Sequence, residues 1–163
     1  MSSDSSSLSP RMVHLVRHGE AMSKAEDPRR PLTEQGRQAA EQVAAWAAKA
    51  GVRVDEIRHS GKLRAEQTAT IFAEHLHVPS QPTAARGLDP DDDVRPVADS
   101  LSREDATVML VGHLPFLSRL TSQLVVGNTD RAIVEFDAAA LVVLSRCNER
   151  WIITAAVQPG LLH

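Results

Sequence analysis

Short apolar runs alternate with segments of helical periodicity along most of this 163-residue chain, and this alternation is what most constrains its fold. The runs are rich in β-branched residues, which is typical of strands. In the segments between them, apolar residues recur every three or four positions, which is typical of amphipathic helices. Strands that alternate with helices predict a mainly parallel sheet with helices on both faces, a three-layer α/β/α architecture.

The expected elements follow from these patterns together with their caps and breakers. Thr33 and Asp93 are suited to cap the first and third helices, and Gly51 is suited to end the first. The expected strands cover residues 12–16, 54–59, 83–86, 106–111, 132–136, 140–145 and 151–157. The expected helices cover residues 34–50, 62–77 and 94–102, and a last one includes residues 117–124.

The C-terminal part departs from the alternation. Its last two strands are joined by a short turn that contains Asn148, so we expect a hairpin and an antiparallel edge strand in the sheet. A chain of this length is expected to form one domain with a real core, here residues 11–163. Residues 1–10 are rich in serine and are expected to be a disordered N-terminal tail.

Composition excludes several classes of function. The apolar fraction of 42% and the charged fraction of 24% are those of a soluble globular protein. A net charge of −3 provides no basic field to hold nucleic acid, and no apolar run approaches the length needed to span a membrane. The N-terminus lacks the features of a signal peptide. The single Cys147 excludes an internal disulfide and fits a cytoplasmic protein. We therefore expect neither a nucleic-acid partner nor a membrane partner.

Three of the expected strands are followed by basic side chains. The first ends in Arg17 and His18, the second is followed by Arg64, and the strand over 106–111 is followed by His113. The carboxyl ends of parallel strands face one crevice, beside helix N-termini whose free N–H groups attract anions. These four side chains are therefore expected to converge on a phosphoryl group, where guanidinium groups hold the non-bridging oxygens.

Gly19 and Gly112 stand next to the two histidines. Since glycine has no Cβ, we expect both positions to let the backbone come close to a ligand. Each element alone has an ordinary explanation: a surface ion pair for an arginine, a structural role for a histidine, a turn for a glycine. Their joint spacing is what favours a site.

Four motifs occur in order over residues 12–124: LVRHGEA, RPLTEQG, HSGKLRAEQTA and VGHLPFL. Together they resemble the histidine phosphatase superfamily and, within it, the small SixA-type phosphohistidine phosphatases. The resemblance implies a phosphoglycerate mutase-like fold and a hydrolase that needs no cofactor.

The resemblance also implies a role for each site residue. His18 is the nucleophile and becomes a transient phosphohistidine that water hydrolyses. Arg17 and Arg64 bind the phosphoryl oxygens, His113 stabilises the transferring group, and Ser60 occupies a supporting position. For the attack, one ring nitrogen of His18 must be unprotonated, with the N–H of the other held by an acceptor such as a backbone carbonyl.

The chain departs from the family pattern after Ser60 and at the general acid. Gly61 follows Ser60 where the family usually has proline, which leaves Arg64 in register. Many relatives that act on small molecules also carry a glutamate as general acid, and here Asp89 is the nearest candidate by position. An imidazole leaving group takes up a proton readily near neutral pH, whereas an alkoxide needs an acid more, so a P–N substrate is favoured.

We expect a metal-independent phosphatase that acts on phosphohistidine in a signalling protein. The segments between the motifs are too short for a capping subdomain, which indicates an open site suited to a histidine-phosphorylated domain. One alternative is a phosphomonoesterase for a small phosphorylated metabolite, either a sugar or a nucleotide phosphate. Another, of a different class, is a non-catalytic phosphate-binding module, against which the presence of both histidines and both arginines argues.

No metal site is expected. Asp89, Asp91 and Asp93 have the alternate spacing of a calcium loop, but the loop glycine and the closing glutamate are absent from the sequence. His75 and His77 lie near a helix end without a third ligand in view.

Overall fold

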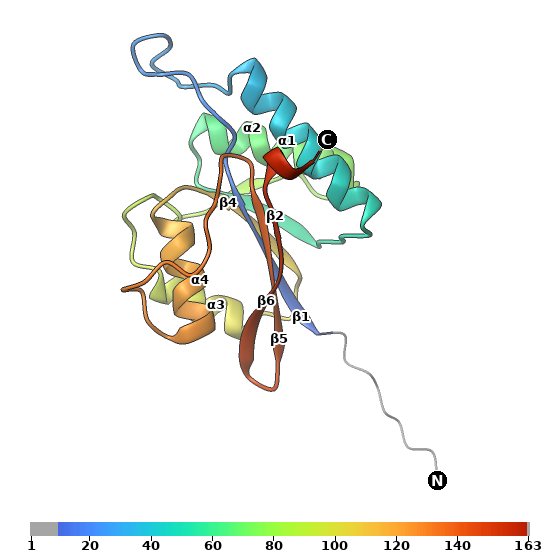
Figure 1. The fold of residues 1–163 in the computed structure, drawn as a ribbon, viewed down its shortest axis with the longest axis vertical. Coiled ribbons are helices and arrows are strands. Elements are labelled where there is room, and N and C mark those ends of the chain that lie inside the picture. Colours follow the sequence, from blue (N-terminus) through green and yellow to red (C-terminus); the bar gives the residue numbers. More distant parts are fainter. Residues whose placement is uncertain (1–9, 163) are drawn as a thin grey trace.

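The computed structural model describes residues 10–162, which build one six-stranded sheet (Figure 1). Across the sheet the strands are β3 (Thr83–Ala84), β2 (Glu56–His59), β4 (Val108–Gly112), β1 (Arg11–Arg17), β5 (Leu141–Cys147) and β6 (Arg150–Val157). Parallel pairing joins β3, β2, β4 and β1, whereas β5 runs antiparallel to both β1 and β6. The predicted mainly parallel sheet with antiparallel pairing at one side is confirmed. The expected tail, residues 1–10, lies outside the described residues apart from Pro10.

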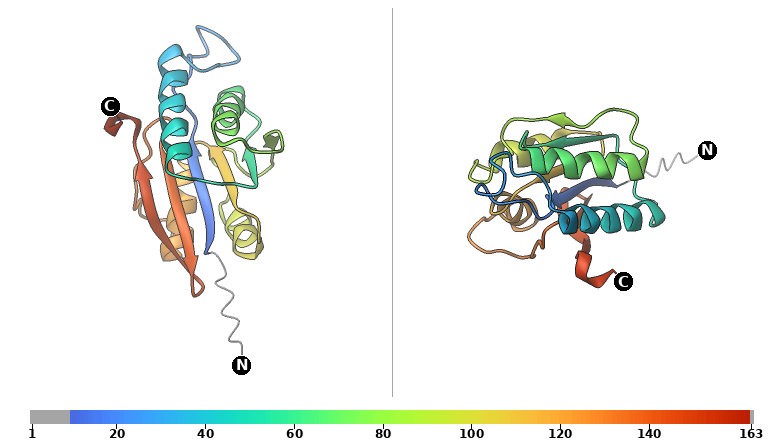
Figure 2. Two further views of the ribbon diagram at one scale, coloured as in Figure 1. Left: turned by 90° about the vertical axis from the view of Figure 1, so that its right-hand side faces the viewer. Right: turned by 90° about the horizontal axis from the view of Figure 1, so that it is seen from above.

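Helices cover both faces of this sheet, as the three-layer prediction requires. Figure 1 shows α1 (Glu34–Lys49) and α2 (Leu63–Leu76) on one face and α3 (Arg95–Arg103) and α4 (Phe116–Val126) on the other, and a 3₁₀ turn, η1 (Pro159–Leu161), lies near the C-terminus. Figure 2 shows α1 and α2 side by side. Between residues 10 and 162, no helix combines the length and the apolar character that crossing a bilayer would take.

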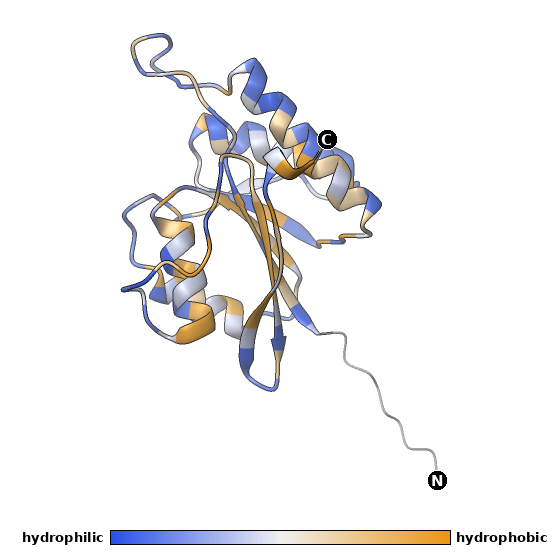
Figure 3. Ribbon diagram, viewed as in Figure 1, coloured by the Kyte–Doolittle hydropathy of each residue, from blue (hydrophilic) through white to orange (hydrophobic). Residues whose placement is uncertain are grey.

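The strands divide their side chains between two hydrophobic clusters. On β1, Val13 and Leu15 pack with α3 and α4, while Val16 packs with α1 and α2. This alternation arises because successive side chains of a strand point to opposite faces of the sheet. Figure 3 shows the resulting concentration of hydrophobic residues in the strands between the helix layers. Most predicted strands and helices agree with the observed ones to within about two residues.

The predicted caps are confirmed for the first helix and corrected for the third. Thr33 is the N-cap of α1, and its hydroxyl oxygen accepts the N–H of Gly36 at 2.9 Å. The N-cap of α3 is Val94 rather than Asp93. Asp93 nevertheless accepts the Arg95 N–H at 3.0 Å, so its carboxylate satisfies a free helix donor from one position earlier.

The strand predicted over residues 132–136 is wrong, because this segment is irregular. It crosses from α4 back to β5; Phe136 is buried and Val134 packs against the same cluster, whereas Ile133 is exposed. The Ser122 hydroxyl donates to the carbonyl of Arg131 at 2.6 Å, and the Arg17 guanidinium donates to the carbonyl of Phe136 at 2.8 Å. These carbonyl groups therefore bond to side chains and not to a neighbouring strand. Alternating hydrophobicity predicts a strand only where such a neighbour is available.

The loop after β1 packs backbone to backbone against the start of α1. A Cβ on Gly36 would lie 2.1 Å from the carbonyl oxygen of Glu20, so no larger residue fits without movement of the loop. We expect Gly36→Ala to lower the free energy of unfolding by about 1–3 kcal/mol, the usual cost of overpacking. Urea unfolding measures it, with Gly160→Ala as the control, because a Cβ there meets no atom within 4 Å. Equal stability of the two variants would contradict this prediction.

Candidate active site

His18 follows the last residue of β1 and has a fixed ring tautomer. Its backbone N–H donates to the carbonyl of Gly112 at 3.0 Å, which ties the ends of β1 and β4 together. Its Nδ1 lies 2.7 Å from the carbonyl oxygen of Gly19. Since a carbonyl can only accept, Nδ1 carries the proton and Nε2 keeps a free lone pair. This is the arrangement that the sequence analysis requires of a nucleophilic histidine.

The surroundings of His18 keep the ring neutral. Burial and then the positive charges of Arg64, Arg17 and Arg30 lower its pKa to about 4, against the hydrogen bond to Gly19, which raises it. Burial disfavours the charged form of any histidine, and the nearby guanidinium groups add to this effect. At neutral pH the ring is therefore an uncharged base beside several cations.

His113 lies directly beside His18. The two ring centroids are 4.8 Å apart and the rings are tilted by 53°. His113 Nε2 is 2.6 Å from the hydroxyl oxygen of Ser60, which places the supporting serine of the second motif in contact with the second histidine. Burial first, and then charges that include those of His18 and Arg64, lower the pKa of His113 to about 3.

These lowered pKa values predict how stability changes with pH. In the unfolded chain these two histidines take up protons near pH 6.5, whereas in the folded protein His18 and His113 take them up only near pH 4 and 3. Between these pH values the unfolded state therefore holds more protons than the folded state. The free energy of unfolding should therefore fall as the pH drops below about 6.5. Urea unfolding at pH 7 and pH 5 measures this, with a smaller drop expected for His18→Gln. An NMR titration midpoint of His18 near its ordinary value would contradict the prediction.

Both predicted arginines lie at the same edge of the sheet as the histidines. Arg17 donates from Nη1 to the carbonyl of Phe136 at 2.8 Å, which holds its side chain across the end of β1. Arg64 is in the first turn of α2. The Nε atoms of Arg17 and Arg64 are buried and have no hydrogen-bond partner among the described residues. The structure thus brings together Arg17, His18, Arg64 and His113.

Arg30 is a third arginine near these side chains, and it was not predicted from the sequence. It has a left-handed backbone, with φ of 50°, and its Nε donates to the carbonyl of Met22 at 3.0 Å. Its charge lowers the pKa of Arg64 as well as that of His18 and His113, in each case after the effect of burial. The available signal was its place at the start of the RPLTEQG motif, which otherwise predicts only a helix cap.

Asp89 lies on the Ser60 side of the site. Both residues line a shallow cavity of about 380 Å³ formed with residues 84–87. The Asp89 carboxylate is 3.9 Å from the Lys62 ammonium group, and its side chain is 59% exposed. This is a solvated position, so Asp89 stays a candidate acid by location only.

The two glycines beside the histidines differ in their surroundings, and the close approach of a ligand at both stays a prediction. A Cβ on Gly19 would lie 2.7 Å from the carbonyl oxygen of Gly36, so this glycine allows the close approach of α1. A Cβ on Gly112 would make only ordinary contacts with Leu117, at 3.6 Å. Helix packing, which single-residue arguments cannot foresee, accounts for the first glycine.

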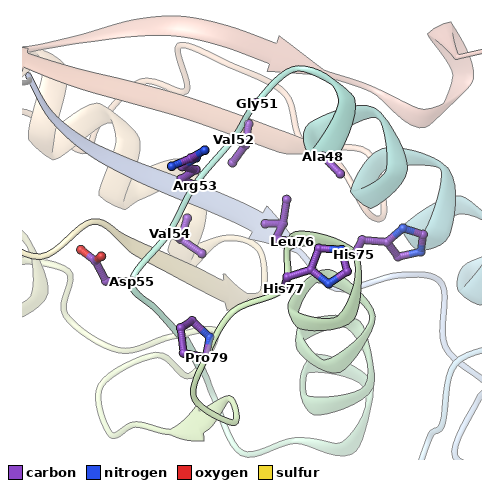
Figure 4. A pocket seen from close by; sticks show the side chains of 10 residues that line it. All are labelled: Ala48, Gly51, Val52, Arg53, Val54, Asp55, His75, Leu76, His77 and Pro79. Atoms are coloured by element: carbon purple, nitrogen blue, oxygen red, sulfur yellow. The ribbon is translucent and has the colours of Figure 1, made fainter.

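A larger cavity lies away from these residues, between the C-terminal ends of α1 and α2 (Figure 4). It measures about 680 Å³, and His75 and His77 are among its lining residues. His75 Nε2 contacts a carboxylate oxygen of Glu41 at 2.9 Å. Within residues 10–162, no group of three or more His, Cys, Asp or Glu side chains is placed to hold a metal ion.

Comparison with known proteins agrees with this geometry. The sequence model of the histidine phosphatase superfamily (branch 1) matches residues 13–88. The phosphohistidine phosphatase SixA of Escherichia coli is 34% identical over 122 residues, which is 72% of this chain and 76% of that protein.

Solved structures share the whole architecture. The structure of SixA complexed with tungstate superposes with a TM-score of 0.83 at 27% identity, over 93% of this chain and 99% of that one. A phosphoserine phosphatase of Entamoeba histolytica, complexed with 3-phosphoglyceric acid, has a TM-score of 0.69 at 16% identity, over 90% and 96% of the two chains. The fold is therefore phosphoglycerate mutase-like. The matched segment spans Arg17, His18 and Arg64, and a third of the aligned residues are shared with SixA. This chain therefore belongs to the histidine phosphatase superfamily and is a hydrolase of that family.

Proposed function

We propose that this protein removes the phosphoryl group from phosphohistidine in a signalling protein, through a phosphohistidine intermediate on His18 and without a metal ion. The observation that carries the proposal is the state of His18, whose Nδ1–H is held by Gly19 while Nε2 is free. A neutral imidazole with its lone pair available is the reactive form of a histidine nucleophile. A cytoplasmic location stays a prediction.

The reaction has two steps in this proposal. The Nε2 of His18 attacks phosphorus, the P–N bond of the substrate breaks with its electron pair on the leaving imidazole, and that imidazole takes up a proton from water. Water then attacks the phosphoryl group on His18 and releases inorganic phosphate. Arg17 and Arg64 hold the non-bridging oxygens, where charge must be stabilised during in-line transfer, and His113, whose ring lies beside that of His18, supports the same group.

Two features favour a P–N bond on a protein over a phosphate ester of a metabolite. The candidate acid Asp89 is solvent-exposed and paired with Lys62, which suits a leaving group that needs little help from an acid. The cavity beside Ser60 is shallow and is formed by the loop that follows the short edge strand β3. The relative SixA of Escherichia coli is a phosphohistidine phosphatase, which points the same way.

The experiment that tests the proposal compares substrates. Purified protein is offered a histidine-phosphorylated domain and a panel of sugar and nucleotide phosphates, each with and without EDTA. We expect kcat/KM to be at least about tenfold higher for the phosphorylated domain, and unchanged by EDTA. Preference for a member of the panel would support a phosphomonoesterase instead, and loss of activity with EDTA would refute the metal-free mechanism.

A further inference from the structure

One buried hydroxyl group connects the loop that carries His18 to the helix that carries Arg64. The N–H of Gly19 donates to Oγ1 of Thr68 at 3.0 Å, and Oγ1 of Thr68 donates to the carbonyl of Arg64 at 2.8 Å. Gly19 is also the residue whose carbonyl oxygen accepts the ring proton of His18. A continuous series of hydrogen bonds therefore runs from His18 through Gly19 and Thr68 to Arg64.

The direction of each bond in this series is determined. The single proton of the Thr68 hydroxyl is donated to the Arg64 carbonyl, so a lone pair of Oγ1 is what faces Gly19. Thr68 is fully buried, so water cannot replace its oxygen as the acceptor of the Gly19 N–H. On the other side, Gly19 is confined by Gly36 of α1. The position of the Gly19 peptide groups thus depends on the Thr68 side chain on one side and on Gly36 on the other.

Other threonines of the molecule show what is particular to Thr68. Thr70 on α2 and Thr121 on α4 make the same bond from their hydroxyl to the carbonyl four residues earlier, at 3.0 and 2.8 Å. Within the described residues, neither hydroxyl bonds any further group. Such a bond within a helix is common for threonine and has only a local effect. The additional bond to Gly19, from a residue 49 positions away, is what distinguishes Thr68.

We propose that Thr68 is a positioning residue that couples the ring orientation of His18 to the placement of Arg64, an inference that rests on the proposed function of both. Thr68 touches no substrate. Its oxygen holds Gly19, Gly19 holds the nucleophile in one tautomer, and the same hydroxyl is bonded to the backbone of a phosphoryl-binding arginine. A small displacement of a nucleophile lowers the rate of the chemical step by up to about 100-fold, which sets the scale of the expected effect.

The test compares Thr68→Val, which keeps the shape and loses the hydroxyl, with Thr68→Ser, which keeps the hydroxyl. Thr121→Val is the matched control, because it removes an equally buried hydroxyl outside the series. With p-nitrophenyl phosphate or a phosphorylated domain as substrate, kcat is expected to fall about 10- to 100-fold in Thr68→Val and to stay within about threefold in the other two variants. Nitrogen-15 NMR of the His18 ring should show one tautomer in the wild type and a mixture in Thr68→Val.

The outcomes separate this inference from the proposed function. A Thr68→Val enzyme as active as Thr121→Val, with an unchanged His18 tautomer, would overturn the role of Thr68. If instead His18→Ala keeps its activity, the proposed function fails, and the NMR readout alone then decides whether Thr68 holds the ring. If Thr68→Val does not fold, Thr68→Ala, which is smaller and also lacks the hydroxyl, is judged by the same two measurements.

Discussion

Replacing His18 by alanine is expected to abolish turnover, with kcat reduced by about 10⁴-fold or more, because the group that forms the covalent intermediate is lost. The fold should survive, since His18 lies beyond the end of β1 and outside both hydrophobic clusters. Hydrolysis of an aryl phosphate and of a phosphorylated histidine domain measures the effect. Brief incubation with labelled substrate should place the label on His18 of the wild type, in a form stable to base and labile to acid.

The chain provides a matched control for this experiment. His14 is also a buried histidine of the same segment, but it lies within β1 and belongs to the sheet rather than to the site. His14→Gln should keep its activity and its label, while His18→Ala should show neither. Equal rates in wild type and His18→Ala would favour a protein that binds phosphate without turning it over. Label on another residue would refute His18 as the nucleophile.

Much of this fold could be predicted because its strands and helices carry clear local patterns. The β-branched run of β1, the Thr33 cap and the turn at Asn148 each depend on neighbouring residues alone. The irregular segment 132–136 could not be predicted in the same way. Its alternation resembles that of a strand, and only the three-dimensional structure reveals that its carbonyl groups bond to side chains such as Arg17.

The residues of the site also differ in whether they could be predicted from the sequence. His18, Arg64 and His113 could be placed together because each follows a strand, and parallel strands deliver their ends to one edge. Arg30 and Thr68 could not be assigned to the site from the sequence. Arg30 reaches the site through a left-handed backbone in a loop, and Thr68 acts through a peptide group 49 residues away in sequence. Neither a loop conformation nor a contact between distant segments follows from spacing.

The positive charges at this site affect both the protonation of His18 and the binding of a phosphoryl group. Burial first, and then the charges of Arg64, Arg17 and Arg30, lower the pKa of His18, because a further positive charge among these three is unfavourable. A phosphoryl group brings negative charge to the same place, so it relieves the repulsion among the cations as it binds. The surroundings that make His18 a free base are thus also those that attract its substrate.

Replacing Arg64 tests this argument most directly. Arg64→Ala removes a partly buried guanidinium group whose Nε has no partner among the described residues, and kcat/KM should fall by about 10²- to 10³-fold, as for the loss of one donor to a transition-state oxyanion. Arg64→Lys should recover only part of this, because an ammonium group lacks the planar pair of donors. Inorganic phosphate should raise the melting temperature of the wild type and have a smaller effect on Arg64→Ala.

A surface arginine supplies the comparison for Arg64. Arg37 on α1 is exposed and paired with Glu34, so Arg37→Ala removes the same charge without touching the site. It should leave kcat/KM and the stabilisation by phosphate unchanged, since its guanidinium group pairs only with exposed carboxylates, and such ion pairs contribute little. If Arg64→Ala and Arg37→Ala behave alike, the guanidinium of Arg64 does not hold the phosphoryl group. If only Arg64→Ala loses both activity and phosphate stabilisation, its effect is local, because the overall charge of the two variants is the same.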